Sequence, residues 1–158
     1  VEADEIIEEV YNLAKKEILK RYNDLNEEEI EKRSRIIGQA ALRFYILKYD
    51  PKKDFTYYPD KSISFEGDTG PYIQYVYARI QSIINKTEVE IDPDIDFSLL
   101  KHKTEKELIF NLYQFPEILK EAAESYKPHL MCQYLLNLSQ KFNAFYDNCP
   151  VISSDEKF

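Results

Sequence analysis

The chain has 158 residues, 44% of them hydrophobic, and a formal net charge of -8. This composition predicts a globular protein, and the acidic balance argues against a general nucleic-acid binder, which usually carries a broad basic field. No apolar run approaches the roughly 20 residues of a membrane helix, and no charged-then-apolar leader opens the chain, so we expect a soluble, cytoplasmic protein without membrane partners. The two cysteines, Cys132 and Cys149, lack metal-ligand spacing and are expected to be free thiols.

The first predicted helix covers residues 4–22, where apolar residues recur three and four apart. Asp4 and Glu5 lie near its start. Lys20 and Arg21 lie near its end. This order of charges suits the helix dipole.

A second helix is expected to begin after Asn26 as N-cap and to run to about Tyr49. Pro51 ends it, because the residue before a proline is displaced from the helical region. Gly38, in the middle of the helix, predicts close packing against a neighbour. Residues 52–64 are expected to be irregular or briefly extended.

Two of the three glycines, Gly67 and Gly70, lie in the next stretch and flank Asp68 and Thr69. Backbone freedom is therefore concentrated where a loop must tighten and begin a helix. Pro71 suits the first turn of that helix, and Asp68 or Thr69 can cap it. We expect this helix to extend to about Lys86.

At about 100° per residue, Tyr72, Tyr75 and Arg79 fall within roughly a 60° arc of this helix. The stripe of Tyr72, Tyr75 and Arg79 is expected to face outward, whereas a neighbouring face is expected to be the core face and comprises Ile73, Tyr77, Ile80 and Ile84. Such an aromatic stripe is most often part of a core. Rings beside an arginine also suit an unstacked nucleotide loop, because bases stack on rings and phosphates accept forked hydrogen bonds.

The segment 87–103 is predicted to be a linker that ends in a basic patch containing Lys101, His102 and Lys103. Thr104 and Glu107 fit a capping box for the helix that follows. A phosphate contact of His102 is one alternative, and an ordinary exposed loop histidine is the other.

The last third of the chain predicts helices that are interrupted near Phe115-Pro116 and restarted at Pro128. His129 is expected to be packed or capping rather than catalytic, because no acid and nucleophile accompany it locally. The carboxylates of Asp92, Asp94 and Asp96 lack the glycine turn and bidentate glutamate of a calcium loop. We therefore predict no metal site.

One run of the sequence carries a family resemblance: Phe65-Glu66-Gly67-Asp68-Thr69-Gly70-Pro71-Tyr72-Ile73-Gln74-Tyr75, followed by Ala78-Arg79. It resembles the signature segment of class I arginyl-tRNA synthetases. The stretches 1–5, 38–45 and 62–67 resemble the residues that follow the ATP-binding loop of that family. The block 108–151 is similar to its DALR-type anticodon-binding domain.

The resemblance implies an all-α fold, a helical bundle of the class I synthetase anticodon-binding type. Residues 1–60 would be the helical segment after the ATP-binding loop. Residues 61–158 would be the anticodon-binding domain, truncated before its last helix. The chain would then be a C-terminal fragment of an enzyme.

The implied function is recognition of the anticodon loop of arginine tRNA, with no role for DNA. Tyr72, Tyr75 and Arg79 match the family positions that face this loop, and Gln74 belongs to the same run. Gly67, Asp68, Thr69 and Gly70 match a flexible loop expected to adjust when tRNA arrives. Lys101, His102 and Lys103 are further candidate phosphate contacts.

The resemblance implies that the parent enzyme attaches arginine to its tRNA using ATP and magnesium and is a monomer. This chain lacks the ATP-binding motifs, so it contains no predicted catalytic residue and no cofactor site, and is expected to be inactive alone. Two alternatives remain: a free-standing helical tRNA-binding module, and a protein-interaction scaffold without ligase activity.

Overall fold

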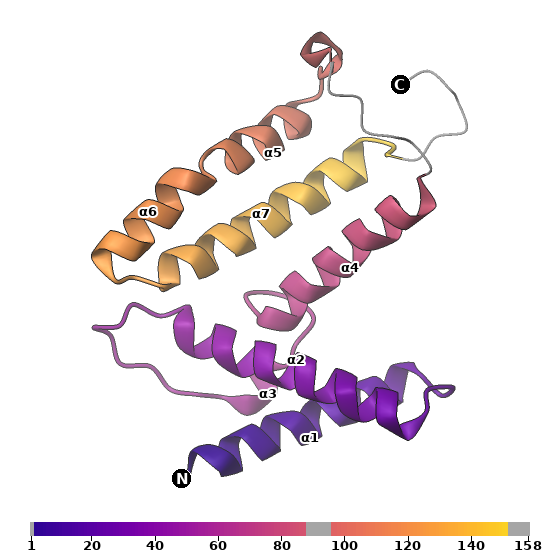
Figure 1. Cartoon of the computed structure of the whole chain (residues 1–158), viewed down its shortest axis with the longest axis vertical. Helices are drawn as coiled ribbons and strands as arrows, with labels where there is room; N and C mark the ends of the chain where they lie inside the picture. Colours follow the sequence, from indigo (N-terminus) through magenta and orange to yellow (C-terminus); the bar gives the residue numbers. More distant parts are fainter. Residues whose placement is uncertain (1, 88–95, 152–158) are drawn as a thin grey trace.

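The computed structural model describes residues 2–87 and 96–151. These residues form helices and no strand, which confirms the predicted all-α class (Figure 1). The elements are α1 (Ala3–Arg21), α2 (Glu27–Leu47), α3 (Pro59–Ser62), α4 (Gly70–Lys86), a 3-10 turn η1 (Phe97–Leu99), α5 (Lys103–Tyr113), α6 (Phe115–Ser125) and α7 (His129–Asn148).

The helices form two packed groups (Figure 1). α1 and α2 pair at one end of the molecule, with α3 beside them. α7 lies between α4 on one side and the nearly collinear α5 and α6 on the other. The first turns of α4 pack against α2, so α4 joins the two groups.

The core of the first group is a cluster of Val10, Ala14, Ala41 and Ile63, all buried. The predicted close packing at Gly38 is confirmed, because a Cβ there would lie 3.3 Å from the Tyr11 Cα on α1. A larger side chain at this position would push the two helices apart.

The helix ends follow most of the sequence signals. Asp4 and Glu5 occupy the first turn of α1, and Lys20 and Arg21 its last turn. Asn26 caps α2 as predicted, its side-chain oxygen accepting the Glu29 N–H at 2.8 Å. α2 ends at Leu47, slightly before the predicted position.

The predicted cap of α5 is wrong. His102 is the N-cap instead of Thr104, with its Nδ1 accepting the Thr104 N–H at 3.3 Å. Glu105 completes the capping box by accepting the His102 N–H at 2.7 Å. With His102 as N-cap, Glu105 is the third helical residue, and Glu107 lies further along the helix, where its carboxylate accepts from Lys141 on α7 at 2.7 Å.

The two proline signals are confirmed. α5 ends at Tyr113, and α6 begins at Phe115 with Pro116 in its first turn. Pro128 is the N-cap residue of α7. The irregular 52–64 segment contains the one-turn helix α3 and packs back through rings, Phe55 stacking on Tyr49 with centroids 4.6 Å apart.

Candidate nucleic-acid interface

The loop before α4 is held in a defined shape. Gly67 has a φ of 78°, which favours glycine. The Thr69 side chain accepts the Tyr72 N–H at 3.2 Å and donates to the Ser64 carbonyl at 2.5 Å. Lys48 of α2 donates to the Asp68 carbonyl at 3.0 Å. The predicted cap at Thr69 is therefore confirmed, and the loop is anchored on both sides.

Gly70 and Gln74 face α2. A Cβ on Gly70 would lie 2.4 Å from the carbonyl oxygen of Ala40, so only glycine allows this approach. Gln74 donates to the Ile36 carbonyl at 3.4 Å, and its Oε1 is buried without a hydrogen-bond partner among the described residues. Both residues fix the position of α4 against the first helix pair.

Asn143 of α7 connects two of the predicted site residues. Its Nδ2 donates to the Tyr72 hydroxyl at 2.9 Å, and its Oδ1 accepts from Arg79 Nη1 at 3.0 Å. One amide therefore sets the positions of a phenol and a guanidinium that lie two turns apart on α4.

Arg79 lies between two aromatic rings. Its guanidinium carbon is 5.1 Å from the Tyr75 ring centroid and 4.9 Å from that of Tyr146 on α7, and Nη2 donates to the Tyr75 hydroxyl at 2.7 Å. Among the described residues no carboxylate pairs with Arg79. Within the described part of the chain, no carboxylate therefore compensates its positive charge, and neutral groups hold the plane of its guanidinium.

The predicted division of α4 into a core face and an outward face is partly wrong. Tyr77 and Ile84, expected in the core, are 62% and 55% exposed, whereas Val76 is buried. Tyr72 and Arg79 are half-buried, and only Tyr75, 45% exposed, faces outward freely. The reason is that α7 packs along the stripe that carries Tyr72 and Arg79.

Beside these residues lies a groove of about 380 Å³, which we call the α4–α7 groove. It is lined by Tyr22, Tyr75, Ala78, Arg79, Ser82, Ile83, Lys86 and Tyr146. Among the residues that the structure describes, the lining includes two cations and no carboxylate. Three tyrosines line it, and those at 22 and 146 were not predicted as site residues.

The structure does not bring the basic patch at Lys101, His102 and Lys103 into this groove. These residues precede or begin α5, which packs on α7 from the side opposite α4 (Figure 1). Lys103 forms an ion pair with Glu107 at 3.3 Å. All three side chains are exposed, so they remain a separate candidate for phosphate contact.

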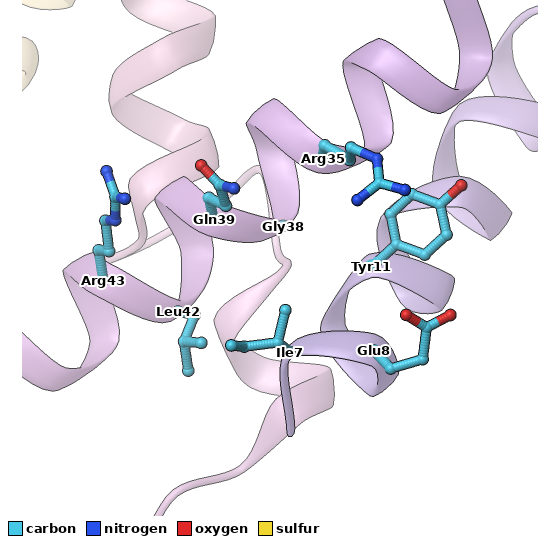
Figure 2. Close-up of a pocket in the computed structure, with 8 residues that line it drawn as sticks. All are labelled: Ile7, Glu8, Tyr11, Arg35, Gly38, Gln39, Leu42 and Arg43. Atoms are coloured by element: carbon cyan, nitrogen blue, oxygen red, sulfur yellow. The ribbon is translucent and has the colours of Figure 1, made fainter. Parts of the chain in front are cut away.

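A smaller pocket lies between α1 and α2 (Figure 2). Its volume is about 170 Å³, below the roughly 300–1,000 Å³ of most ligand sites. Arg35 lies beside the Tyr11 ring, with its guanidinium carbon 5.3 Å from the ring centroid (Figure 2). Ile7 and Leu42 point toward each other on the apolar side. This pocket is a packing feature of the helix pair.

The part of the chain that the structure describes offers few other candidate sites. No group of three histidine, cysteine or acidic residues there could hold a metal ion. Asp92 and Asp94 lie outside the described residues. His129 is buried at the start of α7, with Nε2 3.9 Å from the Asp50 carboxylate. No described helix has the length and apolar character needed to cross a membrane.

Sequence comparison assigns the second group of helices. The family model of the DALR anticodon binding domain matches residues 73–158, more than half of the chain. The chain belongs to the DALR anticodon-binding domain family. The match begins inside α4, and the predicted domain boundary between residues 60 and 61 stays a prediction.

Several curated relatives of this DALR chain are similar along almost its whole length. An arginine–tRNA ligase of Flavobacterium psychrophilum is 39% identical over 99% of the chain. One of Thermococcus sibiricus is 40% identical over 97% of it. The chain spans only about a quarter of these proteins, 26% and 25% of their lengths.

Solved structures agree with the DALR assignment. Thermus thermophilus arginyl-tRNA synthetase superposes with a TM-score of 0.87 and 34% identity, covering 99% of this chain and 27% of that protein. The Plasmodium falciparum enzyme gives a TM-score of 0.84 with 29% identity, over 97% of this chain and 28% of its own. The similarity includes α1 to α3, which the family model does not cover.

Proposed function

We propose that this chain is the part of an arginine–tRNA ligase that holds the anticodon loop of arginine tRNA. The observation that carries the proposal is Arg79, a guanidinium with no acidic partner among the described residues, placed between Tyr75 and Tyr146. The family match and the similarity to arginine–tRNA ligases support it.

In this proposal Tyr75 stacks on an unstacked loop base, because its ring is exposed beside the groove. Arg79 and Lys86 donate hydrogen bonds to the neighbouring phosphates. Tyr72 acts from behind as a positioning residue through Asn143. The anchored loop from Gly67 to Gly70, together with Gln74, sets where α4 begins. Additional phosphate contacts by Lys101, His102 and Lys103 stay a prediction.

The acidic net charge does not oppose this proposal, because the groove is local. Its lining carries Arg79 and Lys86 and, in residues 2–87 and 96–151, no carboxylate, so it attracts phosphate at close range. At physiological salt the screening length is about 8 Å, which limits repulsion from distant acidic faces.

The proposal extends to the longer protein. That protein would attach arginine to its tRNA with ATP and magnesium, as a cytoplasmic monomer, and residues outside this chain would bind ATP. No residue described here is assigned a step in that chemistry.

The experiment is a gel shift of the chain with arginine tRNA and with a noncognate tRNA, at several stated salt concentrations. Tyr75→Ala is expected to weaken binding of arginine tRNA by about 1–3 kcal/mol. Tyr77→Ala is the matched control, an exposed tyrosine on the same helix outside the groove. Equal affinity of the two variants, or equal affinity of the chain for both tRNAs, would reject the proposal.

A further inference from the structure

A second groove adjoins the first on the other side of Tyr75, and we call it the α1–α4 groove. It measures about 520 Å³, within the usual range of ligand sites. It is lined by Glu17, Ile18, Arg21, Tyr22, Arg33, Ile37, Phe65, Glu66, Tyr72 and Tyr75. Tyr22 and Tyr75 line both grooves, which makes the two surfaces continuous.

This groove repeats the pairing of arginine with an aromatic ring. The Arg21 guanidinium carbon lies 4.6 Å from the Phe65 ring centroid, and that of Arg33 lies 5.7 Å from the Tyr22 ring centroid. Tyr22 is 46% exposed at the end of α1. The groove therefore offers flat π-surfaces, the feature that every nucleobase can stack on.

The charges of the two grooves differ. Arg21 pairs with Glu17 at 2.5 Å, and Arg33 pairs with Glu29 at 2.8 Å. Hydrogen bonds from Lys20 and Arg21 lower the pKa of Glu17, so its carboxylate is ionised at neutral pH. Glu66 adds a further carboxylate to the lining. The cations here are compensated, whereas those of the α4–α7 groove have no acidic partner among the described residues.

A phosphate would therefore favour the α4–α7 groove, and a neutral base would favour the α1–α4 groove. A base also carries edge N–H groups that Glu17 or Glu66 can accept, as carboxylates do from cytosine amines. Tyr22 and Tyr75 lie at the boundary between the two grooves. One nucleotide can therefore place its phosphate in the α4–α7 groove and its base in the α1–α4 groove.

We propose that the α1–α4 groove holds one unstacked nucleobase of the RNA whose phosphates occupy the α4–α7 groove, stacked on Tyr22. The inference rests on the proposed function, since it takes the same RNA. It extends the RNA surface onto α1 and α2, outside the part of the chain that matches the DALR family model.

The test uses the full chain and the anticodon stem-loop of arginine tRNA. Tyr22→Leu removes the ring but keeps an apolar side chain, and Tyr22→Phe keeps the ring. Loss of one stacked base predicts about 5- to 140-fold weaker binding for Tyr22→Leu, and Tyr22→Phe should bind like the native chain. Tyr22 caps α1 through its backbone N–H, and its half-exposed ring contacts only the Arg33 side chain among the aromatic–cation pairs described, so circular dichroism melts are expected to change little.

The salt dependence separates a base contact from a phosphate contact. Tyr22→Leu should leave the slope of log affinity against log salt unchanged, whereas Lys86→Ala should reduce it by about 0.7–1. Tyr113→Ala, an exposed tyrosine on α5, is the control for a generic loss of a ring. A reduced slope for Tyr22→Leu, or an affinity equal to that of Tyr113→Ala, overturns the inference.

Stem-loops with a single abasic nucleotide locate the base. At one loop position the abasic change and Tyr22→Leu should be non-additive, because each removes the same stack. Full additivity at all loop positions overturns the inference. If Tyr75→Ala weakens binding and Tyr22→Leu does not, only this inference fails. If neither matters and the chain does not select arginine tRNA, the proposed function fails as well.

Discussion

Asn143 donates a hydrogen bond of 2.9 Å to the hydroxyl of Tyr72, and this bond joins α7 to α4. The same amide accepts from Arg79 at 3.0 Å. A residue of the second helical group therefore positions the groove that we assign to RNA.

Replacing Asn143 by alanine is expected to lower the free energy of unfolding by about 1–3 kcal/mol, because two partly buried polar groups lose their partner. RNA affinity should fall too, since Arg79 is no longer held in plane. Urea unfolding and the gel shift measure the two effects. Asn137→Ala, at an exposed position of α7, is the control. A double-mutant cycle of Asn143→Ala and Tyr72→Phe measures the coupling between the two side chains. A coupling energy of zero would contradict their hydrogen bond.

Gly70→Ala is expected to destabilise the chain by about 1–3 kcal/mol, because the new Cβ would overlap the Ala40 carbonyl and force α4 from α2. Gly67→Ala meets open space but keeps a positive φ, and should cost about 1 kcal/mol. Gly67→Asn should be more stable than Gly67→Ala, because asparagine tolerates a positive φ. Asparagine at position 70 should not be more stable than alanine there, because any Cβ overlaps the Ala40 carbonyl. Thermal melts of these variants check the order.

The two thiols should react at different rates. Cys132 is buried, and burial raises the pKa of its thiol, so little thiolate is present at neutral pH. Cys149 is only half-buried at the end of α7. Iodoacetamide labelling followed by peptide mass spectrometry should find Cys149 modified first. In denaturant the two cysteines should be labelled at similar rates, whereas in buffer Cys149 should be labelled faster. Faster labelling of Cys132 in buffer would contradict the packing of α7.

Glu107 should make stability depend on pH. Hydrogen bonds from Lys141 and Lys103 lower the pKa of its carboxyl below 4.5. The stabilisation is fully present above that ordinary value and is lost as pH falls through the lower folded pKa. Glu107→Gln should therefore destabilise the chain slightly at about pH 6 and less at about pH 3.5, measured by urea unfolding. Glu121→Gln is the control, an exposed glutamate of α6 without an ion pair among the described residues.

Local signals in the sequence predicted most of the helices. Asn26, Thr69 and the two proline breaks act through neighbouring backbone groups, so their effect is readable from short stretches. The cap of α5 was misread because two local pairs overlap: His102 with Glu105 and Thr104 with Glu107 have the same spacing, and the helix begins at Lys103.

The candidate site was partly predictable. The resemblance singled out Tyr72, Tyr75 and Arg79, and the structure links all three by hydrogen bonds, with Asn143 between Tyr72 and Arg79. Tyr22 and Tyr146 were missed as site residues. The periodicity of each helix does not tell which other helix will pack beside these tyrosines. The position of Tyr22 at the end of α1 is the one sequence feature that could have suggested an exposed ring.

The sequence by itself determined the helices, the glycine-hinged loop and the family, because helix periodicity, capping and a contiguous signature are properties of neighbouring residues. Only the tertiary structure decided which face of α4 is covered. Arg79 and Asn143 are 64 residues apart, and their hydrogen bond exists because α7 packs against α4. Packing of distant helices turned a stripe that looked wholly outward into one exposed ring, Tyr75, backed by a positioned arginine.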